Sequence, residues 1–261
     1  MGCPTPRIIL EFWYPSDVEL VGRLSSRGLV DAAFAQDLPF GTVNADSLVA
    51  ALSVQSLGVT AIAAVPLGSR SSAASLSRIA TAYVSGLGGV LIIAGDTKSC
   101  ADSLDVLEAL RFAASLPNVP EGIRVSIYFR PALRERECFL RAAAVDPGSE
   151  RSVSFAPAKV EAGANLLMSQ LMADPASAAG ALERLEPLGV AVALGVPYAP
   201  TEGARARFES LFGARALEPR EMLRSLESVP RRLRRSLYVS PIGRSREGLE
   251  GFLESALSLV G

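Results

Sequence analysis

The stretch from residue 59 to residue 96 reads VTAIAAVPLGSRSSAASLSRIATAYVSGLGGVLIIAGD and predicts one complete strand, helix and strand unit. Its two ends, VTAIAAV and GVLIIAGD, are almost continuously apolar, which is typical of parallel strands covered on both faces. Before the second of these strands, AYVSGLGG supplies a glycine where a helix needs a left-handed C-cap. The same device recurs in ERLEPLGV at residues 183–190. The unit therefore predicts helices that alternate with parallel strands.

Similar apolar runs occur along the whole chain, and most are followed by a segment of helical period. They are RIILEFWY (7–14), DAAFAQD (31–37), VTAIAAV (59–65), GVLIIAGD (89–96), RVSIYFRP (124–131), ANLLMSQLMA (164–173), VAVALGVP (190–197) and SLYVSPIG (236–243). Eight strands that alternate with helices predict a single (β/α)8 TIM barrel domain over residues 1–261. An open doubly wound sheet is the alternative, but no GxGxxG follows the first strand and no GxxxxGK[ST] occurs.

Two long polar stretches interrupt this pattern. The segment 133–152 is the least regular, and we expect it to be an insertion after the fifth strand. The segment 198–235 is long enough for more than one helix before the last strand. It contains an arginine-rich run at residues 231–235, which is more typical of a solvated helix face than of a phosphate site.

Composition narrows the classes of partner. The chain has 261 residues, 49% of them hydrophobic, and a formal net charge of -1. No broad positive field attracts nucleic acid or an anionic membrane, so we expect small molecules or protein, in a homo-oligomer or with a partner subunit. No apolar run reaches the length of a membrane span. The three cysteines, Cys3, Cys100 and Cys138, lie outside any CxxC spacing, which argues against a disulfide framework or a zinc site and predicts a cytoplasmic protein without a metal.

The complete absence of histidine limits the chemistry. Every Ser-His-Asp, Cys-His or His-ligated metal mechanism is excluded, so acid-base work must use carboxylates, Lys, Tyr or Cys. Lysine is also rare, since only Lys98 and Lys159 stand among the 26 basic residues. Because arginine is so strongly preferred over lysine in this chain, each of the two lysines is a candidate for a specific role.

In a barrel, polar residues that end or interrupt a strand are candidates for chemistry, because active sites lie at the carboxyl ends of the strands. The candidates are Glu11, the pair Gln36 and Asp37, Asp96 with Gly95 before it, Gln170 and Asp174, and Lys159 one helix earlier. A carboxyl group at Glu11 in apolar surroundings would have a raised pKa and could hold a proton at neutral pH. The amide of Gln170 either has a structural partner or faces a ligand.

Each candidate also has a structural interpretation. Glu11 could form a buried ion pair with Arg7 or Arg130. The aspartates at strand ends could be helix N-caps, and this is the better interpretation for Asp174, which precedes Pro175.

Three segments taken together resemble the methylenetetrahydrofolate reductase family. LEFWYP (10–15), LIIAGD (91–96) and KVEAGANLLMSQLMAD (159–174) match the family's motifs in order and separation. The resemblance implies a flavin-bearing barrel that reduces the methylene group of a folate-type carrier, with NAD(P)H or another electron donor. It implies that Glu11 and Asp96 are catalytic and that Gln170 and Asp96 bind the pterin. It also implies an FAD site, whose residues would be Lys159, Gln36, Asp37, Gly95 and Ala101.

Two other classes of function stay open on the sequence. One is a non-redox subunit on the same barrel that binds the pterin and has lost the flavin. The other is an unrelated phosphate-binding lyase that uses Lys159 as a Schiff-base amine.

Overall fold

Eight parallel strands form a closed barrel in the computed structural model, which describes residues 3–37, 39, 42–95, 99–116, 118, 136 and 138–260. Each strand pairs with the next along the chain, and β1 also pairs with β8 to close the ring. The strands are β1 (Ile8–Phe12), β2 (Ala32–Ala35), β3 (Thr60–Pro66), β4 (Gly89–Ile93), β5 (Leu140–Val145), β6 (Leu166–Leu171), β7 (Ala191–Tyr198) and β8 (Ser236–Pro241). The predicted single-domain (β/α)8 barrel is confirmed.

The fifth strand is not the one that we predicted. Barrel strand β5 is Leu140–Val145, inside the segment expected to be an insertion, and α5 begins within the same segment at Glu150. The predicted strand at 124–131 lies outside the described residues. The sequence pattern misled here because half of LRAAAV is alanine, which has a low preference for strands, whereas RVSIYFRP is rich in β-branched and aromatic residues.

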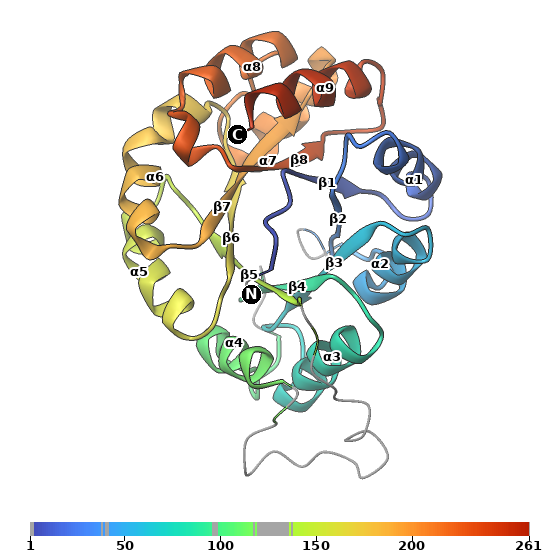
Figure 1. The fold of residues 1–261 in the computed structure, drawn as a ribbon, viewed down its shortest axis with the longest axis vertical. Coiled ribbons are helices and arrows are strands. Elements are labelled where there is room, and N and C mark those ends of the chain that lie inside the picture. Colours follow the sequence, from blue (N-terminus) through green and yellow to red (C-terminus); the bar gives the residue numbers. More distant parts are fainter. Residues whose placement is uncertain are drawn as a thin grey trace.

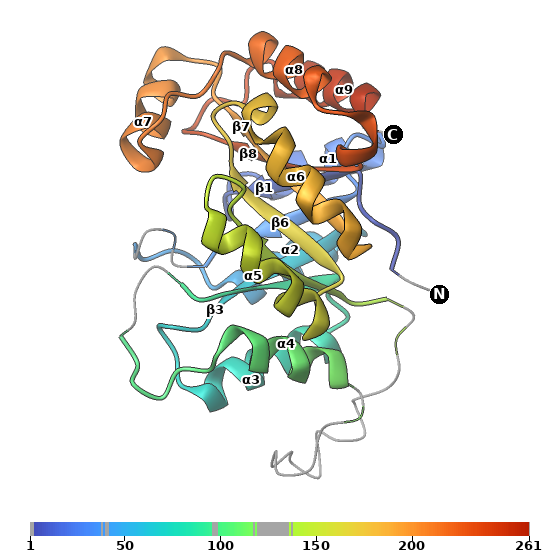
Figure 2. The same cartoon turned by 90° about the vertical axis from the view of Figure 1, so that its left-hand side faces the viewer.

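Helices surround the barrel and cover the outer face of the strands (Figure 1). They are α1 (Val18–Ser26), α2 (Ser47–Gln55), α3 (Ser72–Val84), α4 (Val106–Ser115), α5 (Glu150–Glu161), α6 (Ala179–Leu185), α7 (Glu202–Phe212), α8 (Pro219–Ser228) and α9 (Leu249–Leu259). The polar stretch before β8 holds both α7 and α8, as predicted. Figure 2 shows α7 standing out at the end of the barrel opposite to the N-terminus, which is the end where the strands finish.

The helix ends follow the local sequence. Gly86 and Gly189 adopt positive φ values of 81° and 71° after their helices, as the two glycine-containing motifs predicted. Asp174 accepts a hydrogen bond from the backbone N–H of Ala176, with Pro175 at the first helical position. The predicted capping role of Asp174 is confirmed.

The strands alternate between two buried layers. One set of side chains packs outward against the helices, and the other fills the inside of the barrel. Inward-facing residues include many alanines, among them Ala32, Ala64, Ala142 and Ala193. Because most barrels fill these positions with branched side chains, small residues here leave free space inside.

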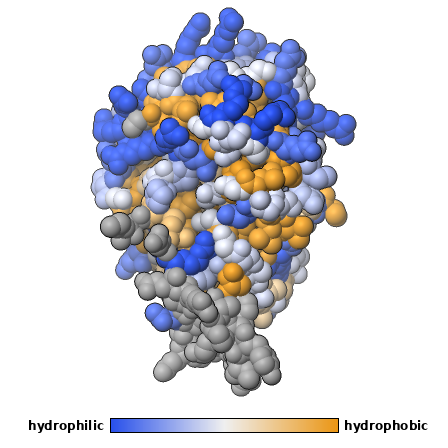
Figure 3. Space-filling view, turned by 45° about the vertical axis from the view of Figure 1, so that its right-hand side comes forward, coloured by the Kyte–Doolittle hydropathy of each residue, from blue (hydrophilic) through white to orange (hydrophobic). Residues whose placement is uncertain are grey.

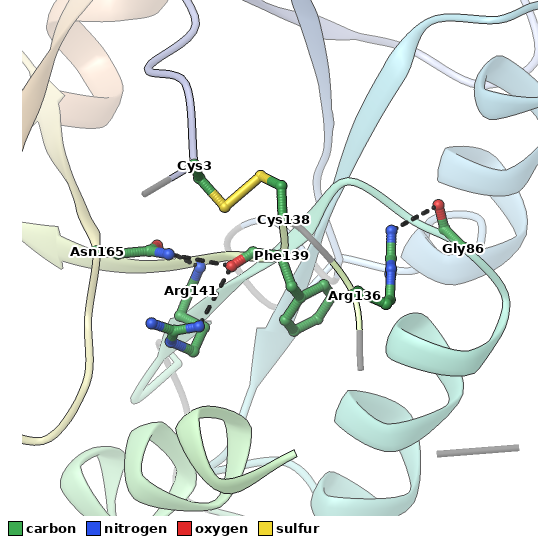
Figure 4. The surroundings of a disulfide bond; sticks show 7 residues. All are labelled: Cys3, Gly86, Arg136, Cys138, Phe139, Arg141 and Asn165. Carbon is green, nitrogen blue, oxygen red and sulfur yellow. Dashed lines mark hydrogen bonds between the residues drawn. A yellow bond between two sulfur atoms is a disulfide. The ribbon is translucent and has the colours of Figure 1, made fainter. Parts of the chain in front are cut away.

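A disulfide between Cys3 and Cys138 lies at the N-terminal end of the barrel (Figure 4). The prediction that the cysteines argue against a disulfide is wrong, because the strand order brings residues 135 positions apart to a Cα–Cα distance of 4.9 Å. Nearby, Arg136 donates hydrogen bonds to the backbone oxygens of Tyr83 and Gly86 at the end of α3. The N-terminal segment and the approach to β5 are therefore fastened to the same end of the barrel. Cys100 is a free thiol.

The outer surface mixes polar and apolar areas, as the orange and blue regions of Figure 3 show. The large apolar side chains exposed on the described residues are Val43, Val49, Leu57, Phe155 and Leu211. Among the helices of the described part of the chain, none has both the length and the apolar character that crossing a membrane requires.

Candidate active site at the barrel mouth

Glu11 and Tyr238 meet inside the barrel at the seam between the first and the last strand. Strands β1 and β8 pair with Ile9 opposite Tyr238, and Glu11 lies two residues further along β1 on the same inward face. The phenol of Tyr238 donates a hydrogen bond to Oε2 of Glu11. Both side chains are buried, with Glu11 at 3% exposure. Glu11 therefore pairs with a phenol, whereas Arg7, one of the arginines considered as its partner, pairs with Asp31.

Burial controls the protonation of this pair. Desolvation raises the pKa of Glu11, although hydrogen bonds from Tyr238, Ser240 and Gln36 and the charge of Arg246 act in the opposite direction. Desolvation, followed by the nearby Glu11, also raises the pKa of Tyr238 well above its ordinary value. The carboxyl group is thus poised to bind a proton nearer to neutral pH than an exposed glutamate, while the phenol stays neutral.

A pocket of about 160 Å³ opens above this pair. Three polar residues, Tyr238, Gln36 and Gln170, belong to its lining, together with apolar residues. The apolar and rim residues are Phe34, Leu91, Ile93, Met168 and Leu171, with Pro39 and Phe212. Phe212 ends α7, so this protruding helix contributes to the pocket. Ala64 and Ala144 also line the pocket, and their small size makes part of the space.

A β-bulge presents Gln170 to this pocket. Between β6 and β7, Met168 pairs with Ala193 but Leu171 pairs with Gly195, so β6 carries one extra residue. The hydroxyl of Ser169 accepts a hydrogen bond from the N–H of Gly195 at 2.7 Å and donates one to the backbone oxygen of Gln170 at 2.8 Å. These two bonds replace the backbone hydrogen bonds between β6 and β7 that the bulge interrupts. Ser169 and Gln170 both line the pocket, and Gln170 is exposed there. Gln170 is therefore not a buried core amide.

Glycine at position 195 makes the bulge possible. A Cβ added there would lie 2.4 Å from the backbone oxygen of Gln170, closer than any real contact. The exposed position of Gln170 thus depends on a small residue in the neighbouring strand.

The second strand ends in a network of charges beside the pocket. Oδ2 of Asp37 accepts hydrogen bonds from Arg70 and from Arg78, both at 2.9 Å, and the side chain of Asp37 is only 3% exposed. Arg78 also pairs with Asp46, the N-cap of α2. The charges of these two arginines and two aspartates therefore balance. Asp37 holds Arg70 and Arg78 in place and also belongs to the pocket lining.

A second ion pair lies near Glu11. Arg246, after β8, donates to Asp17 at 2.6 Å, and both side chains are mostly buried. Asp17 in turn accepts the backbone N–H of Trp13 just after β1. Arg246 therefore has a carboxylate partner of its own and acts on Glu11 only through its charge.

The structure brings together some of the predicted site residues and not others. Glu11, Gln36, Asp37 and Gln170 lie at or directly below the pocket. Lys159 does not line it, because its Nζ donates to the backbone oxygen of Ala144 at 2.6 Å and borders a separate hollow beside α5. Burial lowers the pKa of Lys159.

Two further predicted residues, Gly95 and Ala101, do not line the pocket. Gly95 adopts a φ of 87° after β4, and Ala101 is exposed in a turn. Asp96 lies outside the described residues.

Tyr238 is the main site residue that the sequence reasoning missed. A signal was present, because Ser236, Tyr238 and Ser240 alternate along the eighth strand and therefore share its inward face. Arg70 and Arg78 were missed too, since nothing in their local sequence indicates Asp37 as a partner.

Acidic groups do not cluster in the described residues in a way that would suit a metal ion, since no three side chains of His, Cys, Asp or Glu come together.

Comparison with known proteins shows the fold. No family model and no curated protein sequence matches the chain. A structure titled oxaloacetate acetylhydrolase has 13% identity and a TM-score of 0.55, over 91% of this chain and 75% of the other. A structure titled 3-hexulose-6-phosphate synthase has 12% identity and a TM-score of 0.54, over 97% and 99%. An HpcH/HpaI aldolase from Desulfitobacterium hafniense DCB-2 has 10% identity and a TM-score of 0.50, over 97% and 92%.

These comparisons overturn the predicted family. The expected membership of the methylenetetrahydrofolate reductase family is wrong, since the similar structures are titled as an acetylhydrolase, a synthase and an aldolase, and no family model matches. The predictions of a flavin-dependent oxidoreductase and of FAD as cofactor are wrong with it. Short motifs misled because Gly-Asp and Asp-Pro at strand ends also serve turns and caps in any barrel.

The pterin substrate, NAD(P)H or another electron donor, and assembly as a homo-oligomer or with a partner subunit each stay a prediction.

Proposed function

We propose that this chain is an enzyme that removes and returns a proton next to the carbonyl group of a small substrate. The observation that carries the proposal is the buried contact between Glu11 and Tyr238 at the floor of the pocket. A carboxyl group whose pKa is raised toward neutrality is suited to general acid-base catalysis. The similar structures titled as an aldolase and an acetylhydrolase support carbonyl chemistry on this fold.

Tyr238 is the member of the pair that reaches the pocket, so it is the group that touches the substrate. Ionised Glu11 accepts the phenol proton while the phenol oxygen takes a proton from the carbon next to the carbonyl group. The C–H bond breaks, its electron pair moves into the enolate, and Glu11 ends as a neutral acid. No free tyrosinate forms, which the raised pKa of Tyr238 would make costly. The reverse transfer returns a proton.

An amide above the pair suits the enolate. The side chain of Gln170 carries an NH2 group that can donate a hydrogen bond to the oxygen where negative charge develops, while Gln36 hydrogen-bonds Glu11 beside it. Apolar walls such as Ile93 and Met168 exclude water and strengthen these interactions.

A lyase that uses Lys159 as a Schiff-base amine is less well supported. Its amine is held on a backbone carbonyl and borders a different hollow, so it does not reach the pocket that contains Tyr238.

Deuterium exchange tests the proposal. In D2O, the enzyme is expected to accelerate loss of the methyl proton signal of pyruvate, pyruvamide or acetoacetamide, followed by one-dimensional NMR. Tyr238→Phe should abolish the acceleration. Tyr198→Phe is the matched control, because Tyr198 is also a buried tyrosine, and its hydroxyl contacts the backbone of Glu247 outside the pocket lining. Equal rates in the wild type and in Tyr238→Phe would refute the proposal.

A further inference from the structure

Charge is balanced around the described part of the pocket. Its lining contains no lysine or arginine among the described residues. The arginines nearby are held by carboxylates: Arg70 and Arg78 by Asp37, and Arg246 by Asp17. Among the described lining residues, an anionic substrate would therefore meet glutamine side chains, a phenol and a paired aspartate rather than a free cation.

Breaking one of these pairs to free an arginine would be costly. The side chain of Asp37 is 3% exposed and those of Arg70 and Arg78 are 19% and 14% exposed. Freeing either arginine would take one of two charged partners from a buried carboxylate, because both donate to Oδ2 of Asp37. In the described part of the site, these three arginines are thus held in ion pairs, and we expect the uncharged lining side chains to recognise the ligand.

The exposed Gln170 lines this space and offers a carbonyl oxygen and an NH2 group, so it can complement a ligand that carries a donor and an acceptor side by side. Gln36 also lines the pocket, but its side chain hydrogen-bonds Glu11. A carboxylate offers only acceptors, whereas a carboxamide offers both. The bulge formed by Ser169 and Gly195 holds Gln170 in the exposed position that such recognition needs.

We infer that the substrate of this site is an uncharged carbonyl compound bearing a carboxamide or an equivalent edge of adjacent donor and acceptor, not a carboxylate or a phosphate ester. The inference rests on the proposed proton transfer at the same site and adds the class of molecule. It sets this pocket apart from the neighbours whose titles name oxaloacetate and a hexulose 6-phosphate, which are anions.

Binding of matched amide and acid pairs tests the inference separately from catalysis. The probes are pyruvamide against pyruvate and acetoacetamide against acetoacetate, titrated into the full chain and followed by calorimetry or protein NMR shifts. The wild type is expected to bind each amide at least tenfold more tightly than its acid. Gln170→Lys should reverse the order by supplying a free cation. Ser210→Lys, which adds the same charge on the exposed side of α7, should leave the order unchanged.

The outcomes separate the two proposals. Tighter binding of the acids, or no measurable binding of any probe, overturns the inference about the substrate class. Selective binding of the amides without faster deuterium exchange supports this inference and refutes the proposed proton transfer. Faster exchange of pyruvate together with tighter binding of the acids supports the proton transfer and refutes the substrate class.

Discussion

The phenol of Tyr238 on β8 contacts the carboxyl group of Glu11 on β1, 227 residues earlier in the chain. The two strands are neighbours only because the barrel closes. The contact joins the one inward-facing acid of the first strand to a hydroxyl that reaches the pocket, and the other features of the site are arranged around it.

Replacing Glu11 by Gln is expected to slow deuterium exchange by about 100-fold or more, because the amide keeps the shape and cannot accept the proton. The fold should persist, since an uncharged amide is buried at less cost than an ionised acid. Exchange rates by NMR and the thermal midpoint of unfolding together check this prediction. An unchanged rate in a folded variant would remove Glu11 from the mechanism.

Stability should depend on pH through Glu11. Its pKa in the folded protein is raised above the value of 4.5 that it has when unfolded. The folded state therefore binds more protons between these two pKa values, and the stability due to neutral Glu11 is complete below pH 4.5 and is lost as the pH rises through the folded pKa. The difference in unfolding free energy between wild type and Glu11→Gln should fall as the pH increases.

Urea unfolding of both proteins at a series of pH values measures this difference, and the other titrating groups cancel because both proteins share them. A difference that grows with increasing pH would mean that the fold stabilises the ionised form of Glu11.

Gly195→Ala should destabilise the protein by about 1–3 kcal/mol, because the new Cβ would press against the backbone oxygen of Gln170 and distort the bulge. Gly251→Ala is the matched control. Gly251 lies within α9 and has open space around it, so alanine there should be neutral or stabilise by about 0.5–1 kcal/mol. Urea unfolding compares the two, and equal stabilities would show that position 195 tolerates a side chain.

Cys3→Ser should lower the free energy of unfolding by about 2–5 kcal/mol, since the disulfide with Cys138 restricts a long segment of the unfolded chain. A dithiol reductant should destabilise the wild type and leave the variant unchanged. Titration of thiols in the unreduced, unfolded wild type should detect Cys100 alone. Detection of all three thiols would show that the bond does not form.

Much of the barrel was predictable because strands and helices follow local patterns. Seven of the eight predicted strands overlap barrel strands, and the glycines after α3 and α6 mark helix ends as expected. The fifth strand was not predicted because its alanines are held in the barrel by packing and by hydrogen bonding to β4 and β6. The strand propensity of the local sequence does not reveal these contacts. Inside the site, the positions of Glu11, Gln36 and Gln170 followed from the rule that polar residues at strand ends face the mouth of the barrel.

The sequence by itself determined the alternation of strands and helices, the lack of histidine chemistry and the presence of polar side chains at strand ends, since these depend on residue type and spacing along the chain. Tertiary structure alone decided that Glu11 meets a tyrosine, that Asp37 neutralises two arginines, that Lys159 turns away from the pocket and that Cys3 reaches Cys138. The reason is physical: each of these contacts joins residues that only the closed barrel brings together, and short motifs carry no information about such distances.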